Sequence, residues 1–150
     1  MPVSRATGDI YFSTVDGLSE SQYVFVEGHR LPARWQDNNA KQPFVIGDSG
    51  CGSGLTACLT LETWRQHRPA NRQLHYLAVE QSPLSPQDMR RALAPWPSLT
   101  PALNGLLDHW PDPLPGCHRR HFPDWGVTVD FWWGDANAIL SDLASHGRQW

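Results

Sequence analysis

The segment Pro43–Leu55 constrains the fold of this chain more than any other. It reads Pro-Phe-Val-Ile-Gly-Asp-Ser-Gly-Cys-Gly-Ser-Gly-Leu. The apolar run 44–46 is too short for a helix and suits a strand buried on both faces. Three glycines then let the backbone turn sharply and let a ligand approach closely. Apolar residues at helical spacing follow the loop: Ala57, Cys58, Leu61 and Trp64. A strand, a glycine loop and a helix in this order predict a nucleotide-type site at the start of the helix.

The spacing within the loop narrows the kind of nucleotide. Gly50, Gly52 and Gly54 form G-x-G-x-G rather than G-x-G-x-x-G, which weakens a dinucleotide interpretation. No Gly-Lys-Ser/Thr follows, so the segment is not a P-loop. Asp48 stands two places before the first glycine, an arrangement typical of S-adenosylmethionine enzymes. The loop therefore favours S-adenosylmethionine as the ligand.

A second interpretation rests on the same letters. Gly47-Asp48-Ser49-Gly50 resembles the nucleophile segment of chymotrypsin-like proteases. That chemistry needs a histidine base and a carboxylate on a scaffold of two β-barrels. A chain of 150 residues is too short for two barrels, and helical patterns flank the motif. The protease interpretation is therefore not favoured.

Composition bounds the class of protein. The chain has 150 residues, a hydrophobic content of 40% and no apolar run near the roughly 20 residues of a membrane span, which predicts one globular domain and no membrane partner. The N-terminus lacks the apolar stretch of a signal peptide, so the expected location is the cytoplasm. Three cysteines leave one unpaired, which fits a reducing compartment. The net charge of −3 gives no electrostatic footprint for nucleic acid.

The first 42 residues are expected to form a β-hairpin and a linker, and residues 43–150 a partial cofactor-binding domain. Asp9–Phe12 and Gln22–Glu27 carry aromatic and β-branched residues on either side of the turn pair Asp16-Gly17. Leu31–Gln42 is polar and loop-like.

Strands and helices alternate in the rest of the chain. The helix after the loop should end near Arg68, because Pro69 cannot continue it. The later helices are expected from Ser85-Pro86 to before Pro95, from Thr100-Pro101 to Pro111, and from a cap at Asn137 with Ile139, Leu140 and Leu143 facing inward. The later strands are expected at Leu74–Val79, Cys117–Phe122 and Val127–Trp133. This alternation predicts an α/β fold with a doubly wound parallel sheet.

Ligands of such sheets lie beyond the carboxyl ends of the strands, where the glycine loop, Glu80 and Asp135 should meet. Glu80 follows the second strand, where a carboxylate accepts ribose hydroxyls; the alternative is a solvated acid that begins a turn. Asp135 follows the last strand, where it would accept a hydrogen bond from the adenine amine; the alternative is a helix cap.

Histidine and cysteine indicate neither a metal site nor a nucleophile. His118 and His121 would point to opposite faces of a strand, so with Cys117 they do not converge on one ion. Cys51 lies within the loop, but no base stands beside it in sequence. No metal ligand and no catalytic residue is assigned.

The order of several motifs is more specific than the loop. Besides the glycine loop, the chain contains Tyr11-Phe12-Ser13, Gly17-Leu18-Ser19-Glu20, Tyr23-Val24-Phe25, Val79-Glu80 with Pro83-Leu84, Leu114-Pro115-Gly116-Cys117-His118-Arg119 and Trp133-Gly134-Asp135-Ala136-Asn137. From about Asp9 to about Leu143, this series resembles the N-terminal methyltransferase domain of the bifunctional tRNA 5-methylaminomethyl-2-thiouridine biosynthesis protein.

The resemblance implies a class I methyltransferase (Rossmann-like) fold, of which this chain is the N-terminal half. It implies S-adenosylmethionine as cofactor, tRNA as partner, and methylation of the aminomethyl group of 5-aminomethyl-2-thiouridine at the wobble position. A second, FAD-dependent oxidase domain of full-length relatives is absent here. The residues carried over as cofactor-binding are Asp48, Gly50, Gly52, Gly54, Glu80 and Asp135.

The chain departs from the family's usual letters at four places: Asp48 for Glu, Cys51 for Phe, Thr56 for Asn, and Gln81-Ser82 for a Lys-Phe pair. These changes bear on cofactor affinity more than on the fold.

A larger departure lies at the end of the chain. Family members continue with a strand reading roughly Asp-Ala-Trp-Phe-Leu-Asp-Gly-Phe-Ala-Pro, whose second Asp is the expected catalytic carboxylate. This chain ends at Trp150, so the isolated chain is expected to be inactive. The missing strand would pair with Phe44–Ile46, so an exposed edge is expected to drive dimerisation or aggregation. The alternatives are a class I methyltransferase for another substrate and a non-catalytic nucleotide-binding module.

Overall fold

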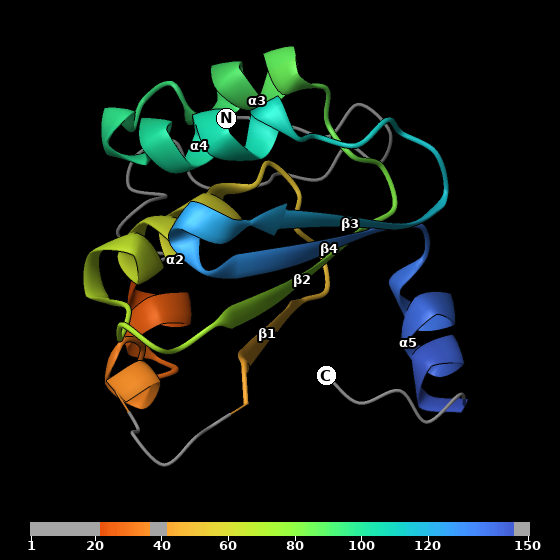
Figure 1. Cartoon of the computed structure of the whole chain (residues 1–150). Helices are drawn as coiled ribbons and strands as arrows, with labels where there is room; N and C mark the ends of the chain where they lie inside the picture. Colours follow the sequence, from red (N-terminus) through yellow and green to blue (C-terminus); the bar gives the residue numbers. More distant parts are fainter. Residues whose placement is uncertain (1–21, 37–41, 146–150) are drawn as a thin grey trace.

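A computed structural model of the chain describes residues 22–36 and 42–145. Within them a four-stranded sheet has the order β1-β2-β4-β3. Its strands are β1 (Phe44–Asp48), β2 (Leu74–Glu80), β3 (Gly116–Phe122) and β4 (Val127–Trp133). β1, β2 and β4 are parallel, and β3 is antiparallel to β4 (Figure 1). The predicted α/β fold with a mainly parallel sheet is confirmed.

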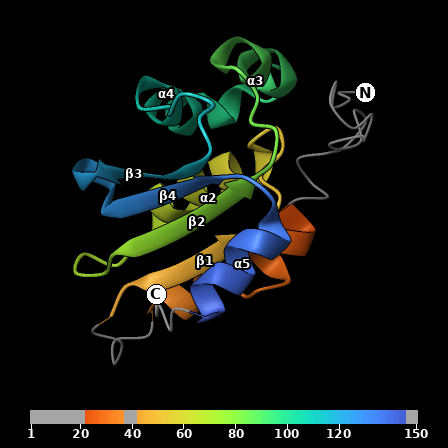
Figure 2. The same cartoon turned by 90° about the vertical axis from the view of Figure 1, so that its right-hand side faces the viewer.

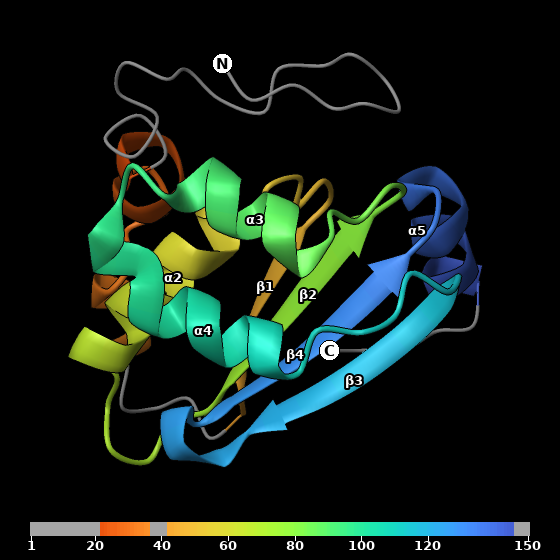
Figure 3. The ribbon, with the colours of Figure 1, turned by 90° about the horizontal axis from the view of Figure 1, so that it is seen from above.

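Helices cover the two faces of the sheet unequally. α2 (Leu55–His67), α3 (Pro86–Leu93) and α4 (Thr100–Asp108) lie on one face, and α5 (Ala136–Ser145) lies on the other (Figures 2 and 3). There are also short helical turns: η1 (Gln22–Glu27) and η2 (Ala33–Gln36) precede β1, η3 (Pro97–Leu99) joins α3 to α4, and η4 (Pro123–Trp125) joins β3 to β4. The main core fills the space between the sheet and α2–α4, and a small second core lies under α5.

The alternation of side chains along β2 explains both cores. Leu74, Tyr76 and Ala78 belong to the main core, and Leu77 and Val79 pack under α5 with Ala136 and Ile139 beside them. A strand covered on both faces reads as a continuous apolar run, because no position needs to meet water. β4 is covered in the same way: six of its seven residues are buried, and the charged Asp130 is one of them.

The start of α3 follows its sequence signature. Ser85 is the N-cap, and its hydroxyl accepts a hydrogen bond of 3.2 Å from the Asp88 amide. Thr100-Pro101 was expected to begin a helix in the same way, with Thr100 as the cap, and this is wrong. Thr100 lies inside α4, which has no side-chain cap, because η3 leads directly into that helix.

Replacing Ser85 by alanine should lower the free energy of unfolding by about 1 kcal/mol, because one amide of the first turn loses its acceptor. Urea unfolding followed by circular dichroism measures this loss. Ser98→Ala in η3 is the matched control, since this exposed serine caps no helix, and it should change stability by less than about 0.5 kcal/mol. Equal stability of the Ser85 variant and the parent would show that the cap contributes nothing.

The second strand of the expected hairpin does not form a strand in the structure. Gln22–Glu27 forms a π-helical turn, and Asp9–Phe12 and Asp16-Gly17 lie outside the described residues. The segment packs against α2 instead of a partner strand. Val26, together with Leu31 and Trp35 further along the chain, joins the main core, and Trp35 meets Trp64 edge to face at 5.1 Å between ring centroids. Within the expected loop Leu31–Gln42, residues 33–36 form η2. The division of the chain at residue 42 stays a prediction.

The last helix begins two residues earlier than expected. Asp135 caps α5, with its Oδ2 accepting a hydrogen bond of 3.0 Å from the Ala138 amide, whereas Asn137 lies inside the helix. Ile139 packs inward as predicted, but Leu140 is 45% exposed. The side chain of Leu143 is outside the described part of the structure. In the described residues, no helix is long and apolar enough to cross a bilayer.

Candidate functional site

The three predicted polar features lie at one end of the sheet. β1 ends at Asp48, β2 ends at Glu80, and Asp135 follows β4, with Glu80 paired to Trp133 across the sheet. The loop from β1 to α2 folds back over the end of β2, where the Cys51 amide donates to the Val79 carbonyl at 3.0 Å (Figure 3). The carboxyl ends of the parallel strands therefore bring the glycine loop beside Glu80.

Two of the loop glycines have conformations that favour glycine. Gly52 has φ +52° and Gly54 has φ +83°, both in the left-handed region. A Cβ on Gly54 would also meet the Met89 side chain at 2.6 Å, so α2 and α3 approach closely there. A Cβ on Gly50, by contrast, would meet nothing within 4 Å. The loop is thus held open on the side of Gly50, where a ligand has room.

Glu80 ties the loop to the end of β2. Its Oε2 accepts a hydrogen bond of 2.9 Å from the Gly52 amide, and its Oε1 accepts one of 3.2 Å from the Ser82 amide. A carboxylate has about four acceptor positions, so both oxygens can still accept ribose hydroxyls. The side chain is therefore oriented before any ligand arrives.

Asp48 has a partner that sequence reasoning missed. Its Oδ2 accepts a hydrogen bond of 2.8 Å from the Tyr76 hydroxyl, and its Oδ1 lies 3.4 Å from the Gly50 amide. Burial raises the pKa of the Asp48 carboxyl, although both hydrogen bonds lower it. Tyr76 lies in the middle of β2 and reads in sequence as a core residue, so no pattern marks it.

Cys51 is buried, and burial together with Asp48 and Glu80 raises the pKa of its thiol well above the ordinary value. A thiol in this setting stays protonated and is a poor nucleophile.

Asp135 is exposed and caps α5, so the structure shows the helix-cap role that was the alternative for this residue. Its predicted contact with adenine stays a prediction.

The residues of β3 have local partners. His118 contacts the Leu114 carbonyl at 2.7 Å, and His121 contacts the Thr128 hydroxyl at 3.1 Å on the other face of the sheet. Among the described residues, no three His, Cys, Asp or Glu side chains are grouped to hold a metal ion. Ser49 lies on a loop of a parallel α/β sheet, so the scaffold of chymotrypsin-like proteases is excluded.

A polar cluster that the sequence did not indicate crosses three strands. Asp130, with an exposed fraction of 0%, accepts hydrogen bonds from Arg119 Nε at 2.7 Å and Nη2 at 2.8 Å. His75 Nε2 lies 2.9 Å from Oδ2 of the same Asp130 carboxylate. Arg119 is directly paired with Asp130 in the strand register, whereas His75 is paired with Thr128 and reaches Asp130 diagonally, 55 positions away in sequence. The cluster lies within the sheet, away from the glycine loop.

The parallel sheet, the glycine loop after β1 and the acid at the end of β2 together define a Rossmann-like methyltransferase fold. No protein-family model matches the chain. Individual proteins do match. The chain is 40% identical to the tRNA 5-methylaminomethyl-2-thiouridine biosynthesis bifunctional protein MnmC of Aeromonas salmonicida over 99% of its own length and 22% of that protein.

Two further bifunctional proteins of the same name give the same result. The chain is 41% identical to that of Acinetobacter baylyi over 95% of its length, and 42% identical to that of Caulobacter vibrioides over 87%. It spans 23% and 22% of these two relatives, respectively. The resemblance predicted from the motifs is confirmed: the chain is homologous to one segment of these bifunctional proteins.

Proposed function

We propose that this chain is the cofactor-binding part of an S-adenosylmethionine-dependent tRNA methyltransferase. Its product would be the methylaminomethyl group that the names of the relatives describe, formed by methylating the aminomethyl group of 5-aminomethyl-2-thiouridine at the wobble position. The observation that carries this proposal is the hydrogen bond from the Gly52 amide to Glu80, which joins the glycine loop to the acid expected at the ribose. The similarity to the biosynthesis proteins supports the choice of substrate.

The residues present fit the cofactor. Open space at Gly50 leaves room for its methionine part, Glu80 has acceptor positions left for the ribose, and the exposed Asp135 offers a carboxylate that would accept from the adenine amine. The cofactor supplies an electrophilic methyl group on a sulfonium. The role of this chain is then to hold that group in line with the acceptor nitrogen, because positioning carries much of the rate of such a transfer.

Replacing Glu80 by alanine should weaken binding of S-adenosylmethionine by about 1.5–3 kcal/mol, the range for hydrogen bonds to a charged group. Removing the 2′-hydroxyl of the ligand should cost less on the variant than on the parent, because its partner is already gone. Calorimetric titration of both ligands into both proteins gives this double-mutant cycle. Asp108→Ala, which removes an exposed carboxylate at the end of α4, is the control and should bind like the parent. Equal losses for the 2′-deoxy ligand on both proteins would remove Glu80 from the ribose site.

We infer that tRNA is the partner, that the activity is cytoplasmic, and that an FAD-dependent oxidase domain accompanies this segment in full-length relatives.

In the described part of the chain β1 pairs only with β2, and Phe44, Val45 and Ile46 are half-buried. An unpaired apolar strand edge is a template for association, so the isolated chain is proposed to associate through β1.

Two alternatives stay open. A methyltransferase for another substrate would bind the cofactor equally well but would not accept tRNA carrying the aminomethyl base. A non-catalytic nucleotide-binding module would bind a nucleotide and transfer nothing. Transfer assays with the 150-residue chain and with a longer chain that reaches the segment expected after residue 150 distinguish the three.

A further inference from the structure

A pocket of about 250 Å³ lies between the two connections that flank α3 and α4. Residues 83–86 lead from β2 into α3, and residues 110–113 lead from α4 toward β3 (Figure 3). β1 contributes no residue to the pocket, which therefore does not border the unpaired edge of the sheet at that strand. None of the residues proposed to bind the cofactor lines it either.

Both walls of the pocket are fixed by interactions within the chain. The Trp110 indole donates a hydrogen bond of 3.1 Å to the Leu84 carbonyl, which joins the two connections. The Trp133 indole donates one of 3.1 Å to the Asp112 carbonyl, which ties the second connection to β4. Four of the eight lining residues are prolines, whose rings restrict the backbone. The pocket is therefore largely formed before a ligand arrives, which lowers the cost of binding.

The polar groups of the pocket favour a ligand that donates hydrogen bonds and carries positive charge. Proline has no amide N–H, so half of the lining residues offer a carbonyl and no backbone donor. The amide and the indole of Trp110 already donate to the carbonyls of Leu107 and Leu84. Asp112 is the only charged residue that lines the pocket, and no cation among the described residues pairs with its exposed carboxylate. An anion such as a phosphate would be repelled there.

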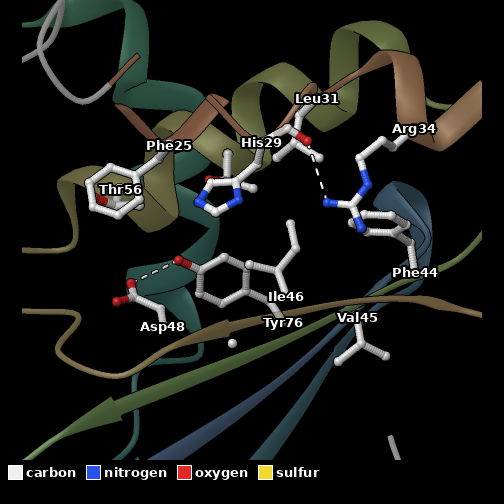
Figure 4. Close-up of a pocket in the computed structure, with 12 residues that line it drawn as sticks. Phe25, His29, Leu31, Arg34, Phe44, Val45, Ile46, Asp48, Thr56 and Tyr76 are labelled. Atoms are coloured by element: carbon white, nitrogen blue, oxygen red, sulfur yellow. Dashed lines mark hydrogen bonds between the residues drawn. The ribbon is translucent and has the colours of Figure 1, made fainter. Parts of the chain in front are cut away.

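The apolar surface suits the stem and the flat head of an arginine side chain. Leu114 follows the pocket directly, is 62% exposed and extends its apolar rim. A guanidinium stacks well on the face of an indole such as the one in the pocket. The chain makes such contacts itself: Arg65 lies 5.2 Å from the centre of the Trp125 ring, and Arg34 lies 5.0 Å from that of Phe44 (Figure 4). The volume is below the roughly 300 Å³ at which pockets for drug-sized ligands begin, so it fits one side chain.

We propose that this pocket binds an arginine side chain on an extended segment of a partner protein. The guanidinium then pairs with Asp112, its aliphatic stem lies between the prolines, and the backbone of the segment runs along Leu114. Charge complementarity selects this partner over a nucleic acid, whose phosphates Asp112 would repel. The inference goes beyond the proposed function and does not depend on it, because the pocket and the proposed cofactor site share no residue.

An NMR titration of the isotope-labelled full chain with a blocked pentapeptide, Ala-Ala-Arg-Ala-Ala, tests the assignment. The matched ligand carries citrulline in place of arginine, which keeps the shape and removes the charge. The arginine peptide should saturate and shift the Trp110 indole signal, and the citrulline peptide should bind about tenfold more weakly. Asp112→Asn should weaken the arginine peptide about fivefold and leave it about a twofold preference over citrulline. Asp124→Asn, which removes an exposed carboxylate from η4, is the control and should bind like the parent.

Several results would overturn the assignment. Equal affinity for the two peptides would do so, as would equal affinity of the parent and Asp112→Asn for the arginine peptide. Saturation of the Trp110 signal by a short oligouridylate would show a nucleic-acid site instead. If only Arg5→Gln binds the peptide, the pocket holds Arg5 of the same chain, which lies outside the described residues. If peptide affinity falls as the concentration of the chain rises, a second copy occupies the pocket.

Discussion

Replacing Arg119 by methionine should lower the free energy of unfolding by about 3 kcal/mol at pH 7, because it leaves a buried carboxylate without its main partner. Asp130 is fully buried and would retain only His75, at 2.9 Å. Methionine keeps much of the length of arginine, so the loss reports the charge rather than the packing. Urea unfolding measures it.

Arg120→Met is the matched control on the same strand. Within residues 22–36 and 42–145, Arg120 donates to the carbonyls of His109 and Arg119 and forms no ion pair with a carboxylate. This variant should lose less than about 1 kcal/mol, as expected for ordinary hydrogen bonds near the surface. Equal losses for the two variants would mean that Asp130 does not depend on the Arg119 pair.

The pH dependence of the free energy of unfolding is a second readout for the Arg119→Met variant. Burial alone would raise the pKa of Asp130, but hydrogen bonds from Arg119 and His75 outweigh it and hold the pKa well below its usual range. A carboxylate with a lowered pKa stabilises the fold above its unfolded pKa of about 4 and loses that contribution as the pH falls. The parent should therefore lose stability in acid, and its advantage over Arg119→Met should shrink there.

Replacing Gly52 by valine should weaken S-adenosylmethionine binding by roughly a hundredfold or more, equivalent to about 2.7 kcal/mol. A β-branched residue is strained at φ +52°. Its side chain would also occupy the space where the ligand is expected to contact the backbone of the loop. A change in the backbone conformation at residue 52 would also disturb the hydrogen bond from its amide to Glu80. Helical content measured by circular dichroism should stay unchanged, because α2 begins three residues later.

Gly47→Ala controls for the loss of a glycine as such. It lies in β1, and an added Cβ would meet nothing within 4 Å. Its affinity for S-adenosylmethionine should equal that of the parent. An unchanged affinity in Gly52→Val would remove the loop from the cofactor site.

Local patterns predicted the elements whose structure is decided locally. The apolar run, the glycine loop and the helical stripe after it gave β1 and α2 almost to the residue, and Ser85 marked the start of α3.

The errors arose where tertiary contacts decide. Gln22–Glu27 has the composition of a strand, but a strand needs a partner, and packing of Val26 against α2 gives the segment a helical turn instead. The Asp48–Tyr76 bond and the Asp130 cluster join residues that are neighbours only across the sheet. No single-sequence pattern carries such pairs, because register appears only once the strands are aligned.

The glycine loop and Glu80 are proposed to form an S-adenosylmethionine site. Calorimetric titration of S-adenosylmethionine into the purified chain, with NAD as the competing ligand, measures whether this site exists. We expect saturable binding of S-adenosylmethionine at one site per chain and no saturation by NAD. Binding of NAD in place of S-adenosylmethionine, or saturation by neither, would contradict it.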